Sequence, residues 1–184
     1  MVWKIITFCI GTVILIFISR DSLRSPRSHG FFRFFAWEAM LALFLLNVEH
    51  WFENPLAWYQ VIAWILLLLC IIPVVWGILL LRKRGRPVEE RSGDPSLLAF
   101  EKTTRLVTSG IYKYIRHPLY SSLLLLALGI FFKLPSWSGA LLALLAALFL
   151  YLTARADEAE CCGFFGPAYQ EYMKTTRRFI PFLF

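Results

Sequence analysis

The sequence predicts an all-α integral membrane protein with about five transmembrane helices, including a C-terminal helical hairpin, and a cytoplasmic C-terminal helix. Three observations predict this class. The 184 residues are 59% hydrophobic, whereas soluble domains are about 45–50% apolar. Five apolar runs approach the roughly 20 residues that cross a bilayer as a helix. Lysine and arginine gather in alternate connecting segments, as they do in cytoplasmic loops.

The first three runs form an N-terminal part, residues 1–81. We expect Val2–Ile18 to be a retained transmembrane helix rather than a signal peptide, because no small-residue cleavage site follows it. The second run, Phe31–Trp51, contains the polar residues Arg33, Glu38 and Asn47. Glu38 deep in this run either lines a tunnel for a substrate or bonds to another helix, and we favour the second reading. The third run, Leu56–Leu81, is long enough to span the membrane, and Pro73 is expected to kink it.

The remaining parts of this single membrane domain are a polar segment and a hairpin. Residues 82–117 are too long for a turn and are predicted to form a cytoplasmic loop. The hairpin, residues 118–152, pairs the runs Pro118–Phe132 and Ser138–Leu152 through a tight turn. Residues 153–184 are amphipathic and are expected to continue as a cytoplasmic or interfacial helix.

The distribution of basic residues predicts the orientation. Nine lysines and arginines lie in residues 82–117, and others follow the first and fifth runs, whereas the opposite side has only Lys4 and Lys133. The positive-inside rule therefore places the N-terminus outside and the C-terminus inside. The net charge of +7 is thus expected to face membrane lipids rather than nucleic acid.

The four cysteines indicate neither a metal site nor a disulfide framework. Cys9 and Cys70 lie within apolar runs, and Cys161 and Cys162 are adjacent, so no metal-ligand spacing occurs. We expect free thiols that pack as small apolar groups, and no bound metal.

The first candidate binding element is the step Arg116-His117-Pro118 at the start of the fourth run. Proline is favoured at the first position of a helix, so this helix is expected to begin here. Its N-terminus would present free N–H groups that suit a carboxylate or phosphate, and Arg116 and His117 would add donors. The alternative is that Arg116 anchors to lipid headgroups and His117 only caps the helix.

The second candidate element is Asp157-Glu158, with Glu160 close by, just after the fifth run. Both elements lie at the cytoplasmic ends of the hairpin helices, so we expect them to be neighbours in space. A pocket with an anion site on one side and carboxylates on the other suits a zwitterionic ligand that carries a cation. The alternative is a solvated helix face paired with nearby arginines: Arg155, Arg177 and Arg178.

These residues resemble a known family. The motifs of the second half of the chain occur in a characteristic order. They are Leu106-Val107-Thr108-Ser109-Gly110-Ile111-Tyr112, then Arg116-His117-Pro118-Leu119-Tyr120, then Asp157-Glu158, and the later Phe165-Gly166, Tyr169, Tyr172 and Ile180-Pro181. Over roughly residues 104–184 the chain is similar to the isoprenylcysteine carboxyl methyltransferases and the related phospholipid methyltransferases. The first three runs show no resemblance beyond their hydropathy.

The resemblance implies an enzyme that transfers a methyl group from S-adenosylmethionine. The residues that match the family's cofactor contacts are Thr104, Arg105, Leu106, Val107, Gly110, Tyr112, His117, Pro118, Leu119, Tyr120, Asp157 and Glu158. Arg116 and His117 would orient the cofactor, and no catalytic base is assigned. Arg155 is the nearest match to an arginine associated with substrate, and Glu38 is a second substrate candidate. Because Asp157 replaces the first glutamate of the family's usual pair, we expect Glu158 to be the main ligand.

The acceptor stays open at this point. A lipophilic molecule carrying an isoprenylcysteine-like carboxylate, a phospholipid amine or a thiol would suit such an enzyme. Two other functions are considered. One is a membrane reductase of the sterol type that uses NADPH, although the chain has no glycine-rich dinucleotide motif. The other is a non-catalytic membrane protein that keeps the fold.

Overall fold

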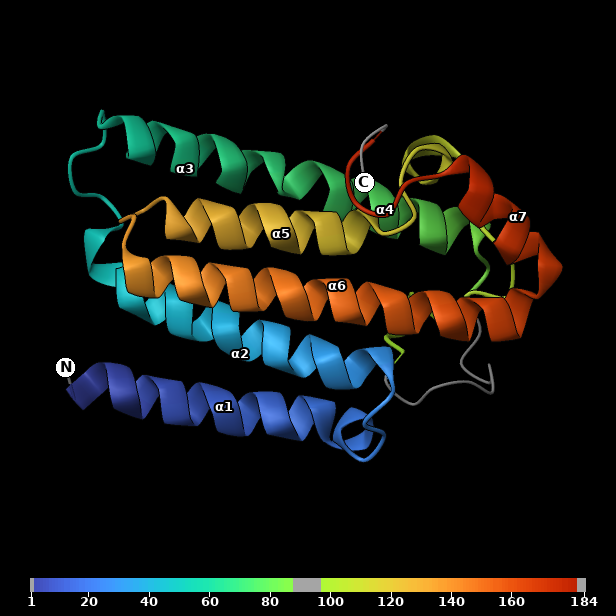
Figure 1. The fold of residues 1–184 in the computed structure, drawn as a ribbon, viewed down its shortest axis with the longest axis horizontal. Coiled ribbons are helices and arrows are strands. Elements are labelled where there is room, and N and C mark those ends of the chain that lie inside the picture. Colours follow the sequence, from blue (N-terminus) through green and yellow to red (C-terminus); the bar gives the residue numbers. More distant parts are fainter. Residues whose placement is uncertain (1, 88–96, 182–184) are drawn as a thin grey trace.

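The computed structural model describes residues 2–87 and 97–181, and its helices lie side by side in a bundle (Figure 1). The α-helices are α1 Val2–Leu23, α2 His29–Asn47, α3 Trp58–Leu69, α4 Ile71–Arg84, α5 Pro118–Phe131, α6 Trp137–Phe165 and α7 Pro167–Thr175, with two short 3-10 helices, η1 Val48–His50 and η2 Gly110–Lys113. Within the described residues, four stretches are long and apolar enough to cross a membrane: Val2–Leu23, His29–His50, Trp58–Arg84 and Trp137–Phe165. The apolar α5 has 14 residues. The predicted all-α membrane class is confirmed.

Two helix boundaries differ from the prediction. The third run divides at Cys70 into α3 and α4, because Pro73 has no N–H to bond the carbonyl of Leu69 and so interrupts the ladder of hydrogen bonds. The helix of the fifth run continues past Leu152, as expected, but α6 ends at Phe165. The next residue, Gly166, has a φ of 59°, in the region that favours glycine. The C-terminal segment therefore consists of the last turns of α6 and a separate α7.

The core lies where α2, α5 and α6 meet. The most extensive contact is between α6 and α2, while α1 packs on α2 and α3 and α4 cover α5 (Figure 1). Ala143 and Ala146 of α6 are buried against α2 and α5, as expected for small residues at membrane helix contacts. Gly129 permits the approach of α3, since a Cβ there would lie 2.9 Å from the side chain of Leu67.

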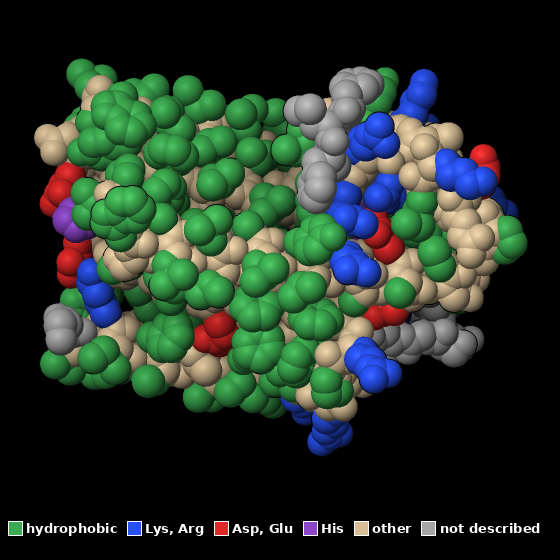
Figure 2. Space-filling model, in the orientation of Figure 1, with side chains coloured by type: hydrophobic (Ala, Val, Ile, Leu, Met, Phe, Trp, Pro, Cys, Tyr) green, Lys and Arg blue, Asp and Glu red, His purple; other side chains and the backbone are tan. Residues whose placement is uncertain are grey.

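The two ends of the bundle differ in character. Figure 2 shows hydrophobic side chains over most of the visible face, with lysine and arginine gathered at the end where α7 lies. We call this end the polar end; it comprises residues 97–117, the last turns of α6, α7 and residues 176–181. The site described next lies there.

Candidate functional site

The loop before α5 is shaped by a glycine turn and held by α7. Gly110 has a φ of 64°, and a Cβ there would lie 2.6 Å from the side chain of Leu80. The turn leads into η2, which buries Tyr112. The hydroxyl of Tyr172 on α7 donates a hydrogen bond to the carbonyl of Tyr112 at 2.6 Å. This contact fixes the loop against the last helix.

The segment after α7 runs beside the residues that precede α5. The N–H of Arg116 donates to the carbonyl of Arg177 at 2.8 Å, and that of His117 donates to the carbonyl of Arg178 at 3.1 Å. Arg177 in turn donates its N–H to the carbonyl of Tyr114 at 3.0 Å. These backbone hydrogen bonds bring the side chain of Arg178 to the start of α5.

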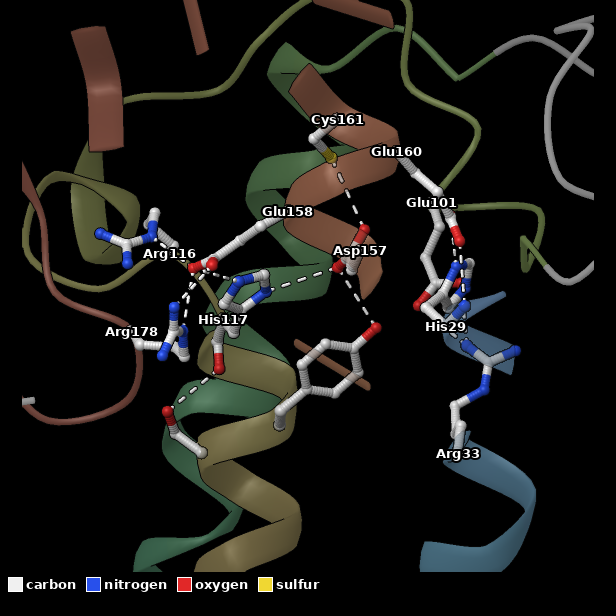
Figure 3. Close-up of polar contacts among 12 residues, drawn as sticks. His29, Arg33, Glu101, Arg116, His117, Asp157, Glu158, Glu160, Cys161 and Arg178 are labelled. Carbon is white, nitrogen blue, oxygen red and sulfur yellow. Dashed lines mark hydrogen bonds and ion pairs between the residues drawn. The ribbon is translucent and has the colours of Figure 1, made fainter. Parts of the chain in front are cut away.

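Glu158 lies at the centre of a buried charge cluster (Figure 3). Its carboxylate accepts hydrogen bonds from Arg116 Nε at 2.8 Å and from Arg178 Nε and Nη2 at 3.0 and 2.7 Å. Arg116 also donates to the carbonyls of Met173 and Thr176. Only 5% of Glu158 is exposed. Charge-assisted hydrogen bonds of this kind are the strong ones, so Glu158 joins α5, α6 and the C-terminal segment.

His117 lies between two carboxylates. Its Nε2 is 3.3 Å from Glu158 Oε1, and its Nδ1 is 3.4 Å from Asp157 Oδ2. The ring stacks on Tyr120 with centroids 5.3 Å apart. Burial by itself would lower the pKa of His117, but the hydrogen bonds to Asp157 and Glu158 outweigh burial and raise the pKa above its ordinary value. The geometry therefore favours the imidazolium, in which both nitrogens donate.

A cavity of about 400 Å³ opens beside this cluster. Its lining comes from α4, from residues 97–107, from η2, from residues 116–117 and the first turn of α5, from the last turns of α6 and from α7. The lining residues are Leu81, Leu97, Glu101, Thr103, Leu106, Val107, Tyr112, Arg116, His117, Pro118, Leu119, Tyr120, Asp157, Glu160, Cys161, Gly163, Phe164, Phe165, Tyr169 and Tyr172. The volume falls within the range of small-molecule sites, about 300–1,000 Å³.

Asp157 is the carboxylate of the predicted pair that faces the cavity. It accepts a hydrogen bond from the hydroxyl of Tyr120 at 3.2 Å, and the thiol of Cys161 lies 3.5 Å from its other oxygen. Glu158 is absent from the lining. Adjacent residues of a helix point about 100° apart, so one of them faces the ligand space while the other faces the ion cluster.

Two further carboxylates line the cavity, and each is paired with a basic side chain behind it. Glu160 contacts His29, with Oε2 2.5 Å from His29 Nδ1. Glu101 accepts from Arg33 Nη1 at 3.2 Å. Figure 3 shows both pairs on the side of Asp157 away from Glu158. Both basic side chains come from α2, in the part of the chain where the sequence shows only hydropathy.

His29, Asp157 and Glu160 also form the group whose ligand atoms could hold a metal ion, since these atoms lie within 4.8 Å of one another. The 2.5 Å between His29 Nδ1 and Glu160 Oε2 is a hydrogen-bond distance. We therefore describe the contact as a hydrogen bond, and the expected absence of a metal stays a prediction.

The predicted site residues fall into two sets. The cavity is lined by Leu106, Val107, Tyr112, Arg116, His117, Pro118, Leu119, Tyr120 and Asp157, whereas Thr104, Arg105, Gly110, Glu158, Arg155 and Glu38 lie outside the lining. Arg155 is exposed. Glu38 accepts a hydrogen bond from Thr12 Oγ1 at 2.9 Å, which is the contact between helices that the sequence favoured.

Some lining residues were not predicted as ligands. Glu101 and Thr103 lie in a loop without a pattern that would single them out. Glu160 was expected only to lie close to the acidic pair, and Cys161 only to pack as a small apolar group. Both follow Asp157 on α6, by three and four residues, so their place on the same helix face was a usable signal.

Together, the apolar bundle and its polar end define an integral membrane protein with a cavity lined by charged and aromatic side chains. The sequence model of the phospholipid methyltransferase family matches residues 58–162, and the chain belongs to this family. The protein-S-isoprenylcysteine O-methyltransferase of Schizosaccharomyces pombe is 37% identical over 79 residues, which are 42% of this chain and 34% of that protein. The match thus spans about a third of the length of that relative. No solved structure matches the chain.

Proposed function

We propose that this protein transfers a methyl group from S-adenosylmethionine to a lipophilic acceptor. The observation that carries the proposal is the position of His117, held between Asp157 and Glu158 at the N-terminus of α5 and in the wall of the cavity. Membership of the phospholipid methyltransferase family supports the reaction class.

The residues of the cavity fit the charges of this donor. The first N–H groups of α5 have no partner within the helix and suit the donor's carboxylate, and the positive charges of Arg116 and His117 lie beside them in the cavity wall. Asp157 and Glu160 suit its ammonium and sulfonium groups. Tyr112 and the aromatic residues of the last turns of α6 and of α7 offer faces for the adenine ring and for the positive sulfur.

The bound donor supplies an electrophilic methyl group, and the chain's own residues orient the partners and exclude water. Leu81 of α4 and Leu119 of α5 give part of the lining an apolar character, which suits a lipophilic acceptor. An isoprenylcysteine-like carboxylate, a phospholipid amine and a thiol all remain candidates for this acceptor.

We propose further that the polar end faces the cytoplasm, with the N-terminus outside. Lysine and arginine gather at this end (Figure 2), in agreement with the positive-inside rule. Labelling of a cysteine introduced at the exposed Arg105 in sealed vesicles of known orientation tests this. Labelling from the extracytoplasmic side would overturn the assignment.

Calorimetry with the purified protein tests the donor site. The wild type is expected to bind S-adenosylmethionine and its product S-adenosylhomocysteine. His117→Ala and Asp157→Ala should weaken binding at least tenfold, while Lys113→Ala, at an exposed position outside the lining, should leave it unchanged. A wild type that binds neither compound would overturn the proposal. Labelled methyl transfer to a membrane extract then identifies the acceptor.

A further inference from the structure

The N-terminal turns of α2 carry two buried basic side chains that reach the cavity wall from behind. His29 has no exposed surface, and Arg33 is 6% exposed. Both lie outside residues 58–162, where the family model matches, and neither lines the cavity. Burying a polar or charged side chain is costly unless it is paired, and both side chains are paired with carboxylates of the cavity wall.

His29 fixes both oxygens of Glu160. Its backbone N–H donates to Oε1 at 2.9 Å, and its ring Nδ1 lies 2.5 Å from Oε2. Because His29 is the first residue of α2, the carboxylate also lies at the positive end of that helix. The Glu160 side chain keeps 28% exposure and lines the cavity. Its orientation toward a ligand is therefore set by a residue that the ligand does not touch.

Arg33 holds Glu101 in a comparable way. Its Nη1 lies 3.4 and 3.2 Å from the two oxygens of Glu101, and the N–H of Leu98 donates to Glu101 Oε2 at 2.8 Å. The guanidinium also lies over the ring of Trp37, 5.2 Å from its centroid. Arg33 thus fixes both a wall carboxylate and the turn that carries it.

We propose that His29 and Arg33 are positioning residues of the donor site, acting through Glu160 and Glu101. A half-buried carboxylate that loses its partner takes up a proton or turns to another cation, and either change removes an oriented negative group from the cavity wall. The inference rests on the proposed function, since it assumes that the cavity holds the cationic donor. It makes α2, which lies outside the matched region, part of the cofactor site.

The test compares the affinity for S-adenosylhomocysteine with the melting temperature. His29→Ala and Arg33→Met should each weaken binding about tenfold. His29→Asn keeps an N–H donor near the position of Nδ1 and should stay within threefold of the wild type. Asn47→Ala is the matched control, because it removes a buried hydrogen bond of 2.9 Å to the carbonyl of Ile130 at the opposite end of α2. It should lower the melting temperature and leave the affinity unchanged.

A double-mutant cycle tests whether the effect of Arg33 on binding passes through Glu101. If Arg33 acts through Glu101, Arg33→Met should have no further effect in a Glu101→Gln background. The inference is overturned if His29→Ala and Arg33→Met bind within twofold of the wild type, if His29→Asn binds as weakly as His29→Ala, or if the two effects in the cycle add. A wild type without binding would instead overturn the proposed function, so the two failures are distinguishable.

Discussion

Replacing Glu158 by glutamine should destabilise the protein more than replacing its neighbour Asp157 by asparagine. Glu158→Gln keeps the shape of the side chain but leaves the guanidinium groups of Arg116 and Arg178 and the ring of His117 without their shared counter-charge. Breaking a buried ion pair by removing one partner costs about 3–5 kcal/mol. Because 20% of the Arg178 side chain is exposed, we take the lower value, about 3 kcal/mol.

This loss corresponds to a fall in melting temperature of about 6–12 °C for a chain of this length. Asp157 has weaker contacts, 3.2 Å to the hydroxyl of Tyr120 and 3.4 Å to His117 Nδ1. Asp157→Asn should therefore cost about 1 kcal/mol, the value of a typical hydrogen bond. Ligand affinity should show the opposite order, since Asp157 faces the cavity and Glu158 does not.

Thermal unfolding in one detergent, with and without S-adenosylhomocysteine, measures both quantities. A Glu158→Gln variant that melts within 2 °C of the wild type would refute the assignment of Glu158 to the structural cluster. A Glu158→Gln variant that retains its stability and loses ligand binding would show that Glu158, as the sequence alone suggested, is the main ligand.

Three further predictions follow from single contacts. The raised pKa of His117 means that its charged form stabilises the fold fully below the ordinary pKa of about 6.5, and that this stability is lost as the pH rises through the higher folded-state pKa. The melting temperatures of the wild type and His117→Gln should therefore converge as the pH is raised, and a constant difference from pH 6 to 9 would contradict this. Gly129→Ala should lower the free energy of unfolding by about 1–3 kcal/mol, because its Cβ would lie 2.9 Å from a side chain of α3. Gly163→Ala is the control and should be neutral or stabilising, since a Cβ there would meet no atom of another segment within 4 Å. Equal melting temperatures of the two variants would refute the close contact at Gly129. Lys133→Met should lower the free energy of unfolding by about 2 kcal/mol. The buried Lys133 side chain donates two hydrogen bonds and lies 3.5 Å from the centroid of Trp64. An unchanged melting temperature would contradict a stabilising role for these contacts.

Much of the architecture was predictable because a bilayer imposes simple rules on the chain. The length of apolar runs and the position of Pro118 predicted the membrane class and the start of α5 at that residue. The resemblance of the ordered motifs led to the family that the sequence comparison shows. The expectation that the residues before α5 and the acidic pair of α6 are neighbours followed from the hairpin, and the structure brings them together.

The sequence alone determined the membrane class, the family and the two elements that meet beside the cavity, because these depend on local composition and on short motifs. Tertiary structure decided which of two adjacent carboxylates faces the cavity, since that depends on the rotation of α6 against its neighbours. It also decided the pairs Arg33–Glu101 and His29–Glu160, which are 68 and 131 residues apart in the chain. No local pattern encodes such pairs, because they arise only when α2 packs against α6 and the loop before α5.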